Sequence, residues 1–175
     1  MLQVSLHEGA GLMSDLTVRI VRLEPMRVAC IRVVSVSPER DAWEKLRAWV
    51  APKGLLDNPA EHPVFGFNNP NPSTERQEYG YEFWIGVGPD VSGEGEIEVK
   101  EFAGGLFAST TCRLVGDSAG SVPEIWRKLW EWVQVNGGYR WRKAHELEQC
   151  RNPQAAEADI ELDLHLPIEK RPHQD

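Results

Sequence analysis

One segment of this sequence occurs twice, and the repetition constrains the fold more than any other feature. The stretch SPERDAWEKLRAWV begins at Ser37, and the similar stretch SVPEIWRKLWEWV begins at Ser121. Five residues recur at one constant offset: Trp43, Lys45, Leu46, Trp49 and Val50 correspond to Trp126, Lys128, Leu129, Trp132 and Val133. Two tryptophans six residues apart, with matching apolar neighbours, rarely recur by chance in a chain of 175 residues. We therefore predict two copies of one structural module.

Each copy is predicted to be a helix, because its apolar residues recur at the spacing of one helical face. The first helix is expected to start after Ser37, which serves as its cap, and to end at Gly54. The second is expected to run from Ser121 to about 135, with Ser121 and Glu124 forming a capping box. Each helix thus carries Trp and Leu on one face, where they are expected to be part of the core.

Period-two alternation and short apolar runs predict strands on both sides of each helix. The expected strands are 16–23, 28–36, 64–67 and 80–87 in the first half, and 97–102, 106–114, 145–150 and 160–166 in the second. This order favours an α+β fold made of two βαββ modules related by a pseudo-twofold axis, each with an antiparallel sheet and one long helix. The modules are expected at about 16–90 and 95–168, between a flexible arm at 1–15 and a polar tail at 169–175. Since one helix covers one sheet face, the open faces are expected to form a ligand cleft between the modules.

Composition excludes several classes of function. The net charge of −8 and the pI of about 5.2 oppose binding to nucleic acid, whose phosphates attract basic proteins. The sequence has no apolar run long enough to span a bilayer and no secretory signal at its start, so we expect a cytoplasmic protein with no membrane partner. The three cysteines and the histidines lack metal-ligand spacing, and no phosphate-binding or nucleophile motif is present. We expect neither a metal nor a cofactor.

The expected open faces carry acidic and aromatic residues. In the strand at 80–87, Glu82 and Trp84 share one side. We expect Glu161 of the last strand, and Glu148 with Cys150 of the strand before it, to lie on open faces too. The walls of the cleft would then include Trp84, Phe65 and Phe67, with Glu148 near its base and Trp141 as a second tryptophan candidate. Carboxylates beside aromatic rings suit a flat, cationic organic molecule. The alternative, that Glu82, Glu148 and Glu161 simply face water, stays open.

Several motifs together resemble the GyrI-like family, also known as the effector-binding domain of AraC-type and MerR-type regulators. These are YGYEFWIGV, VKEFAGGLFA, the Ser-x-Pro-Glu-x-Trp-x-x-Leu helix, LEQC and ELDLHLPI. The resemblance covers about Leu16 to Ile168 and implies a tandem pair of SHS2 modules that binds lipophilic cationic drugs through a buried glutamate. The family places that glutamate in a Glu-x-Tyr motif, which here reads Glu148-Gln149-Cys150, and a second glutamate corresponds to Glu161. Cys150 therefore stands where the family has an aromatic residue.

Three hypotheses follow for the function. The first is a stand-alone effector-binding module for a hydrophobic, cationic aromatic molecule, since the chain has no room for a helix-turn-helix region before Leu16. Its expected ligand-binding residues are Glu148, Glu82, Trp84, Phe65, Phe67, Cys150, Glu161 and Trp141. The second is a hydrolase of electrophilic cyclopropane compounds, as in some stand-alone relatives, with Glu148 or Glu82 as general base or acid. The third is a protein-interaction partner, for a regulator or another protein, that uses Trp130 and the acidic surface.

Overall fold

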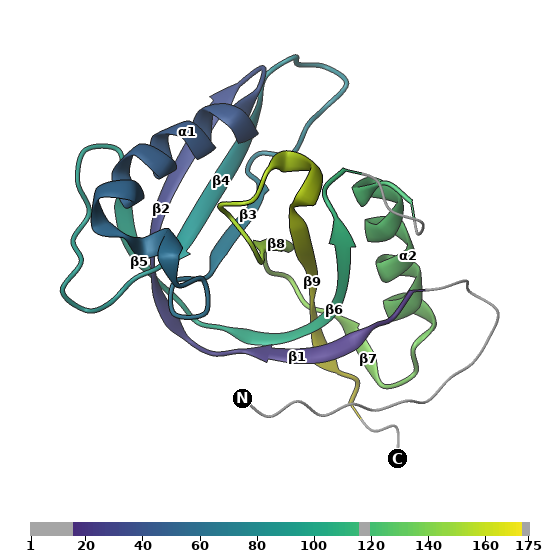
Figure 1. Cartoon of the computed structure of the whole chain (residues 1–175). Coiled ribbons are helices and arrows are strands. Elements are labelled where there is room, and N and C mark those ends of the chain that lie inside the picture. The colour runs from purple at the N-terminus through teal and green to yellow at the C-terminus, as the bar shows by residue number, and fades with distance from the viewer. Residues whose placement is uncertain (1–15, 116–119, 173–175) are drawn as a thin grey trace. The chain divides into compact units, whose positions relative to one another are not determined.

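The chain forms two units, each made of antiparallel strands and one long helix (Figure 1). The computed structural model describes residues 16–115 and 120–172, so the predicted arm at 1–15 lies outside the described residues. One unit, called the β4 unit after its strand β4 (Tyr79–Gly86), comprises Pro25–Ala103 and Glu148–Gln154. The other, called the β6 unit after its strand β6 (Gly105–Arg113), comprises the described residues of Met1–Glu24, Gly104–Leu147 and Ala155–Asp175. Each unit therefore takes residues from both halves of the sequence.

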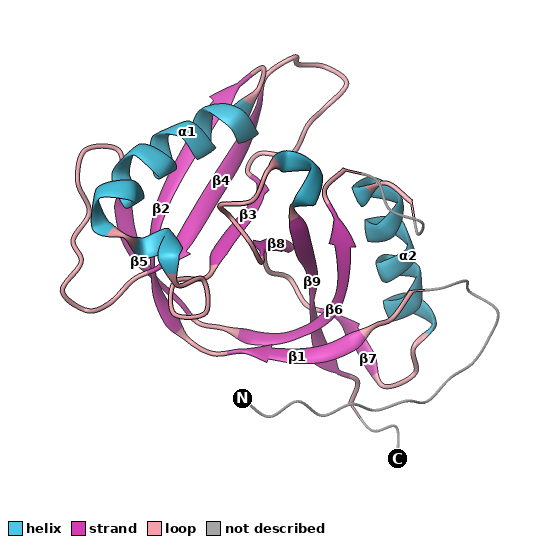
Figure 2. Ribbon diagram, viewed as in Figure 1, coloured by secondary structure: helices cyan, strands magenta, loops and turns pink. Residues whose placement is uncertain are grey.

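The elements confirm the predicted α+β class (Figure 2). The strands are β1 (Arg19–Leu23), β2 (Met26–Ser35), β3 (Val64–Asn68), β4 (Tyr79–Gly86), β5 (Glu98–Phe102), β6 (Gly105–Arg113), β7 (Tyr139–Trp141), β8 (Leu147–Cys150) and β9 (Glu161–Lys170). The helices are α1 (Pro38–Val50) and α2 (Val122–Val135), with short 3-10 turns at Ala51–Lys53, Leu55–Asp57 and Glu157–Asp159. β7 is an additional strand that the sequence pattern did not predict. Within the described part of the chain, no helix is long and apolar enough to cross a membrane.

The last strand corrects one prediction. The strand expected at 160–166 is longer, because β9 continues through Pro167 to Lys170, into the polar tail predicted at 169–175, and pairs with both β6 and β7. A strand residue directs its N–H and its C=O toward the same neighbour. The Pro167 carbonyl accepts a hydrogen bond from the Arg142 N–H at 3.0 Å, just beyond the end of β7. The missing proline N–H therefore points past the end of that short strand and leaves the pairing with β6 intact.

In the β6 unit, the strands lie in the order β1-β6-β9-β7, and α2 packs against β6, β7 and β9. The predicted capping box is confirmed: the Glu124 carboxylate accepts hydrogen bonds from the Ser121 N–H at 2.6 Å and from its hydroxyl at 2.9 Å. The buried residues of α2 are Ile125, Leu129 and Val133, one residue per turn.

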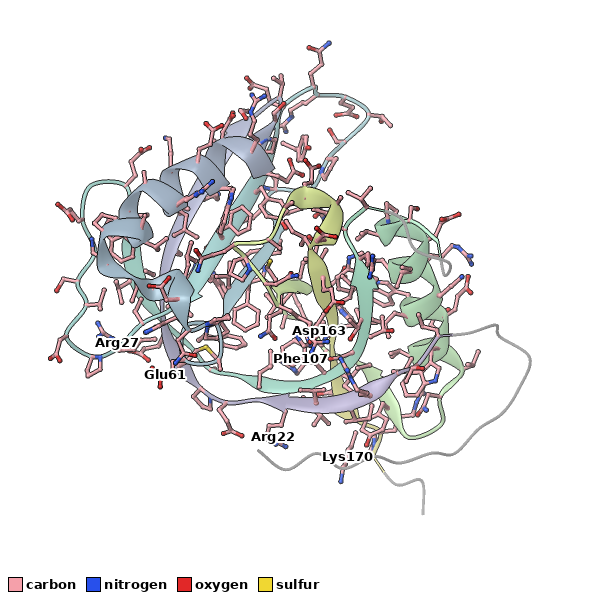
Figure 3. All side chains as sticks on the ribbon, in the orientation of Figure 1. Arg22, Arg27, Glu61, Phe107, Asp163 and Lys170 are labelled. Atoms are coloured by element: carbon pink, nitrogen blue, oxygen red, sulfur yellow. The ribbon has the colours of Figure 1, made fainter. Side chains whose placement is uncertain are left out.

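Polar residues alternate with apolar ones in the first half of β9, and some of them contact polar residues of β6. Ser109 lies opposite His165, and their side chains share a hydrogen bond of 2.6 Å between Oγ and Nδ1. Asp163, labelled in Figure 3 together with Phe107, accepts a hydrogen bond from Arg19 at 2.9 Å. His165 and Ser109 are buried, whereas the Asp163 and Arg19 side chains are 17% and 39% exposed, so this row of polar groups runs from the interior toward the surface.

In the β4 unit, the strands lie in the order β5-β2-β4-β3-β8, with residues Glu148–Cys150 of β8 at one edge. Helix α1 lies across β2 and β4 (Figure 1). Its apolar stripe is buried against one face of the sheet, and the members of this core include Ala42, Leu46, Val50, Ala29, Ile31, Val64 and Ile85. The helix thus covers one face, as predicted.

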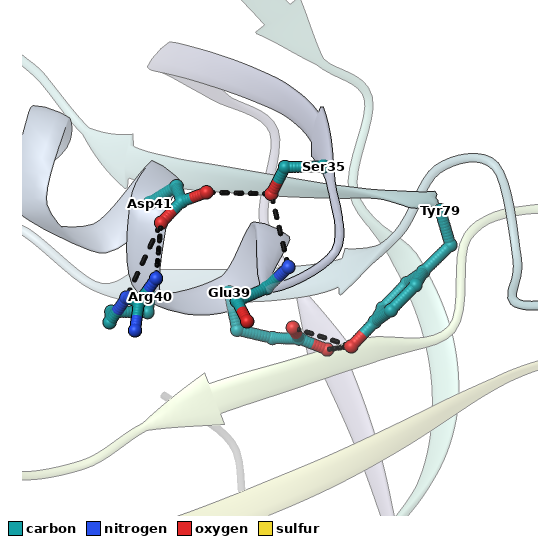
Figure 4. A network of polar contacts seen from close by, with 6 residues as sticks. Ser35, Glu39, Arg40, Asp41 and Tyr79 are labelled. Carbon is teal, nitrogen blue, oxygen red and sulfur yellow. Dashed lines mark hydrogen bonds and ion pairs between the residues drawn. The ribbon is translucent and has the colours of Figure 1, made fainter. Parts of the chain in front are cut away.

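The start of α1 corrects a second prediction. Ser37 is the residue before the helix, but its side chain makes no capping hydrogen bond. Instead, the Ser35 hydroxyl accepts the Ser37 N–H at 3.1 Å and donates to Asp41 at 2.6 Å (Figure 4). The Tyr79 hydroxyl donates to Glu39 at 2.8 Å and so joins β4 to the first turn of the helix. Acidic residues near the positive end of a helix are favourable, which accounts for their place here.

Candidate functional site

Strand β4 places Glu82 and Trp84 on the sheet face opposite α1. Phe83 and Ile85 pack in the core beneath the helix, and the Trp43 and Phe83 rings lie 5.4 Å apart. Since neighbours along a strand point to opposite faces, Glu82 and Trp84 point away from the helix. Both are buried. The prediction that these two residues share a face without the helix is therefore confirmed.

Aromatic rings surround this position. The register of β3 places Phe65 beside Trp84 and Phe67 beside Glu82. The Phe67 and Trp84 rings meet edge to face with centroids 4.8 Å apart, and Phe102 of β5 lies 5.4 Å from Trp84 and 6.3 Å from Phe65. These spacings are those of contacting aromatic side chains. The acidic group thus lies in an aromatic environment made by β3, β4 and β5.

Three donors hold the Glu82 carboxylate. Its Oε1 accepts hydrogen bonds from the Trp84 Nε1 at 2.7 Å and from the Lys100 ammonium, and its Oε2 accepts one from the Asn69 Nδ2 at 2.9 Å. The backbone N–H of Asn69 donates to the Gly80 carbonyl at 2.8 Å, which holds this residue beside β4. We refer to Glu82, Trp84, Asn69 and Lys100 as the Glu82 cluster.

The cluster keeps Glu82 ionised. Burial by itself acts to raise the pKa of this carboxyl, because the charged form loses water. The hydrogen bonds from Lys100, Trp84 and Asn69, together with the Lys100 charge, outweigh burial and hold the pKa below its ordinary value. The site therefore presents a buried negative charge at neutral pH.

Lys100 contacts both parts of the cluster. Its ammonium bonds to Glu82 and lies 4.7 Å from the centroid of the Trp84 ring, a cation-π distance. The Lys100 side chain is 41% exposed, whereas that of Glu82 is 6% exposed. The lysine therefore lies on the solvent side of the carboxylate.

Glu148 and Cys150 lie on the other face of the sheet, which corrects their predicted position beside Glu82. The register pairs Gly66 of β3 with Glu148 and Val64 with Cys150, and Cys150 packs against the core beneath α1. The buried Tyr81 donates its hydroxyl hydrogen bond to Glu148 at 2.7 Å. Burial first, and then Glu148, raise the pKa of Tyr81 well above its ordinary value, so the phenol remains a donor.

A glycine makes this arrangement possible. A Cβ at Gly66 would collide with the hydroxyl and ring of Tyr81, which crosses over that position of β3. The family motif singled out Glu148 as a candidate site residue. The sheet face on which Glu148 lies depends on the pairing of β3 with β8, which the motif does not specify.

Glu161 and Trp141, the two remaining predicted site residues, belong to the β6 unit. Glu161 is partly buried and opens β9 opposite Arg113. Trp141 is 42% exposed, and its ring lies 5.8 Å from that of Trp130. Neither residue belongs to the Glu82 cluster. Within residues 16–115 and 120–172, no three His, Cys, Asp or Glu side chains are grouped to hold a metal ion.

Sequence reasoning missed three residues of the site, namely Lys100, Phe102 and Asn69. Alternation in β5 contains a signal for two of them, because Lys100 and Phe102 share a face opposite to that of Val99. Asn69 lies just after β3, in a segment rich in proline and asparagine, where no periodic pattern indicates direction. Its role appears only when the loop is placed beside β4.

Comparison with known proteins identifies a family. The family described as integron-associated effector binding protein matches residues 19–168. No protein with a curated description matches the chain. The match agrees with the predicted resemblance to GyrI-like effector-binding domains.

Solved structures show the same fold. The C-terminal domain of EcmrR is 16% identical with a TM-score of 0.62, over 89% of this chain and 99% of that one. EcmrR in its complex with DNA is 18% identical with a TM-score of 0.65 over 89% of this chain, which spans only 58% of the length of that protein. An integron cassette protein from the mobile metagenome of Vibrio cholerae is 12% identical with a TM-score of 0.54, over 87% of this chain and 95% of that one.

Proposed function

Because the chain belongs to the family of integron-associated effector-binding proteins, we propose that it binds a hydrophobic, cationic aromatic small molecule at the Glu82 cluster. The family description supports small-molecule effector binding in general. The chemistry of the β4 unit supports the finer statement about the ligand. The rings that would contact the ligand are those of Trp84, Phe65, Phe67 and Phe102.

The observation that carries the proposal is an ionised carboxylate buried among aromatic rings. A buried charge is costly unless a partner of opposite charge or several donors compensate it. A ligand that brings a positive charge to Glu82 keeps that compensation, whereas a neutral or anionic ligand does not. Aromatic faces add stacking and cation-π attraction, which together favour flat organic cations over small inorganic ones.

Glu82 takes the role that the family motif assigns to Glu148. Glu148 lies on the α1 face and accepts a hydrogen bond from the buried Tyr81. Glu82 lies on the face that carries Trp84 and both β3 phenylalanines; Trp84 bonds to it, and the rings of Phe65, Phe67 and Phe102 are linked to Trp84 by ring contacts. The charge and the rings needed for an aromatic cation therefore occur together at Glu82.

Isothermal titration calorimetry with two isosteric probes tests the proposal. The probes are 1-methylquinolinium, a flat cation, and 1-methylnaphthalene, its neutral counterpart. In Glu82→Gln we expect the affinity for the cation to fall by roughly tenfold or more, the value of one charge-assisted hydrogen bond, while the affinity for the neutral probe does not fall. Trp84→Leu should lower the affinity for both probes.

The matched control is Glu96→Gln in the same unit. Glu96 also pairs with a lysine, Lys45, at 2.8 Å, but its side chain is 69% exposed and lies outside the cluster. This variant removes the same charge from the protein and should leave both affinities unchanged. The proposal would be contradicted if Glu82→Gln lost affinity equally for both probes, or if the natural sequence bound neither probe.

A further inference from the structure

We propose that Lys100 is a tethered competitor for the ligand, so that an organic cation binds at Glu82 only by displacing the Lys100 ammonium. This inference rests on the proposed function and adds the group that sets selectivity at the same site. The Lys100 ammonium makes the two contacts that an aromatic cation would make there: a hydrogen-bonded charge pair with Glu82 and a cation-π contact of 4.7 Å with Trp84.

The position of Lys100 on an edge strand allows it to leave. In the β4 unit, β5 pairs with β2, and the register places Lys100 opposite Val28, while Glu82 lies one strand further on, opposite Arg32. The lysine side chain therefore reaches across β2 and along the Trp84 ring to arrive at the carboxylate. A long, flexible side chain that ends in a compact, strongly hydrated charge can move into water by rotation about its own bonds.

The other two donors to Glu82 are held in place. Trp84 is buried in contact with Phe67 and Phe102, and the backbone of Asn69 is bonded to Gly80. The buried Trp84 N–H would lose its hydrogen bond without access to water if the ring moved. Lys100, at 41% exposure, loses its bond to Glu82 and its contact with the Trp84 ring, but its ammonium gains hydration. Of the three donors, Lys100 is the one that a ligand can replace.

Replacement conserves charge at the site. When a cation takes the place of the ammonium, Glu82 remains paired and the released lysine is solvated. When a neutral molecule takes that place, Glu82 loses its charged partner in a buried position, which is strongly unfavourable. The exchange therefore discriminates cations from neutral isosteres more sharply than the aromatic rings do alone. It also weakens the affinity for every cation, because each one competes with a group held permanently nearby.

Lys100→Met tests this inference, because methionine retains an apolar stem and removes the competing charge. We expect the affinity for 1-methylquinolinium to rise by roughly tenfold to a hundredfold, the range of one charge-assisted hydrogen bond. The affinity for 1-methylnaphthalene should rise less, because this probe brings no charge to Glu82. Lys45→Met is the control, since Lys45 has a similar exposure of 44%, pairs with Glu96 outside the cluster and carries the same charge. It should bind both probes like the natural sequence.

A second measurement uses the natural sequence and does not depend on the folding of a variant. Brief acetylation with acetic anhydride, followed by peptide mass spectrometry, reports the access of reagent to each lysine. Saturating 1-methylquinolinium should accelerate modification of Lys100 and leave that of Lys45 unchanged, and 1-methylnaphthalene should accelerate neither.

The outcomes separate this inference from the proposed function. If the natural sequence binds the cation through Glu82 but Lys100→Met binds no more tightly, or Lys100 becomes less reactive when the cation is bound, the lysine is a structural partner and the inference is wrong. If neither the natural sequence nor Lys100→Met binds the cation, the proposed function is wrong and the inference falls with it.

Discussion

The Glu82→Gln substitution tests the electrostatics of the cluster even without a ligand. Glutamine has nearly the shape of glutamate and lacks its charge. Its single amide oxygen can still accept from Trp84 and Lys100, but its NH2 group would face the Asn69 NH2, which now bonds to the second carboxylate oxygen. Asn69 must rotate its amide to present oxygen instead. The variant therefore keeps the number of bonds but loses their charge.

The size of the effect follows from the three bonds. A hydrogen bond to a charged group contributes about 1.5–3 kcal/mol, and one between neutral groups about 0.5–1.5 kcal/mol. The two buried bonds, from Trp84 and Asn69, should each lose about 1 kcal/mol on this basis. The bond from Lys100 contributes less, because solvent screens this exposed side chain. We expect Glu82→Gln to lower the free energy of unfolding by about 2 kcal/mol at pH 7, an amount that a typical domain tolerates without unfolding.

The effect should depend on pH with a defined sign. The pKa of Glu82 in the folded protein lies below its value in the unfolded chain. Its ionised carboxylate therefore stabilises the fold above the unfolded-state pKa, about 4.3, and this contribution is lost as the pH falls through the lower folded-state pKa. The difference between the natural sequence and Glu82→Gln should be full at pH 7 and smaller near pH 3.

Urea unfolding followed by tryptophan fluorescence measures this difference at each pH. Glu96→Gln, which removes an exposed carboxylate, should show almost no loss at either pH. A variant more stable than the natural sequence at pH 7, or a loss of the same size at pH 7 and pH 3, would refute the reasoning, because either result would mean that the charge of Glu82 does not stabilise the fold.

Three further predictions concern groups outside the cluster. Tyr81→Phe removes the hydrogen bond to Glu148 and should lower the free energy of unfolding, measured in urea, by about 1.5–3 kcal/mol. It should not alter the ratio of the affinities for the cationic and neutral probes, and a changed ratio would mean that Glu148 contacts the ligand. Gly66→Ala should cost about 1–3 kcal/mol by overpacking against the Tyr81 ring, and an equal cost in a Tyr81→Ala background would show that the ring is not the cause. Burial lowers the pKa of His165 from 6.5 to about 4, so its neutral form stabilises the fold above pH 6.5 and this contribution declines toward pH 4. In His165→Gln, unfolding measured at pH 7 and pH 4.5 should therefore depend less on pH, and an unchanged dependence would contradict a buried neutral histidine.

Local periodicity predicted much of the fold. The capping box at Ser121 and the burial of Leu129 and Val133 in α2 were predicted correctly, because both depend on residues three or four positions apart. Trp126 and Trp132, which were expected in the core, are only partly buried, and Ile125 is buried on that helix. The common face of Glu82 and Trp84 was also predicted correctly, because the alternation of a strand is a property of its backbone. The cap at Ser37 was a local error, because Ser35 makes the bonds there instead. The other errors occurred where a distant strand decides the outcome. The pattern ended the last strand at 166, but pairing with β6 and β7 extends β9 to Lys170.

The Glu82 cluster shows the same difference between features set by local sequence and features set by distant strands. The aromatic residues of β3 and the acidic residue of β4 were predicted together because each follows the alternation of its own strand. The face of Glu148 was predicted wrongly, because no local pattern specifies which residue of β3 pairs with it. Lys100 was missed for a related reason: its contact with Glu82 requires β5 to pair with β2 and its side chain to cross that strand.

The sequence by itself determined the α+β class, the buried faces of the helices and which residues alternate along each strand, because these depend on bonds and sterics within a few residues. The tertiary structure decided which strands pair, which face carries Glu148, and that Lys100 and Asn69 meet at Glu82. Those contacts join residues 13, 18 and 67 positions apart, as in Asn69 with Glu82, Lys100 with Glu82, and Tyr81 with Glu148. Their geometry is set by the packing of whole strands, which no short stretch of sequence specifies.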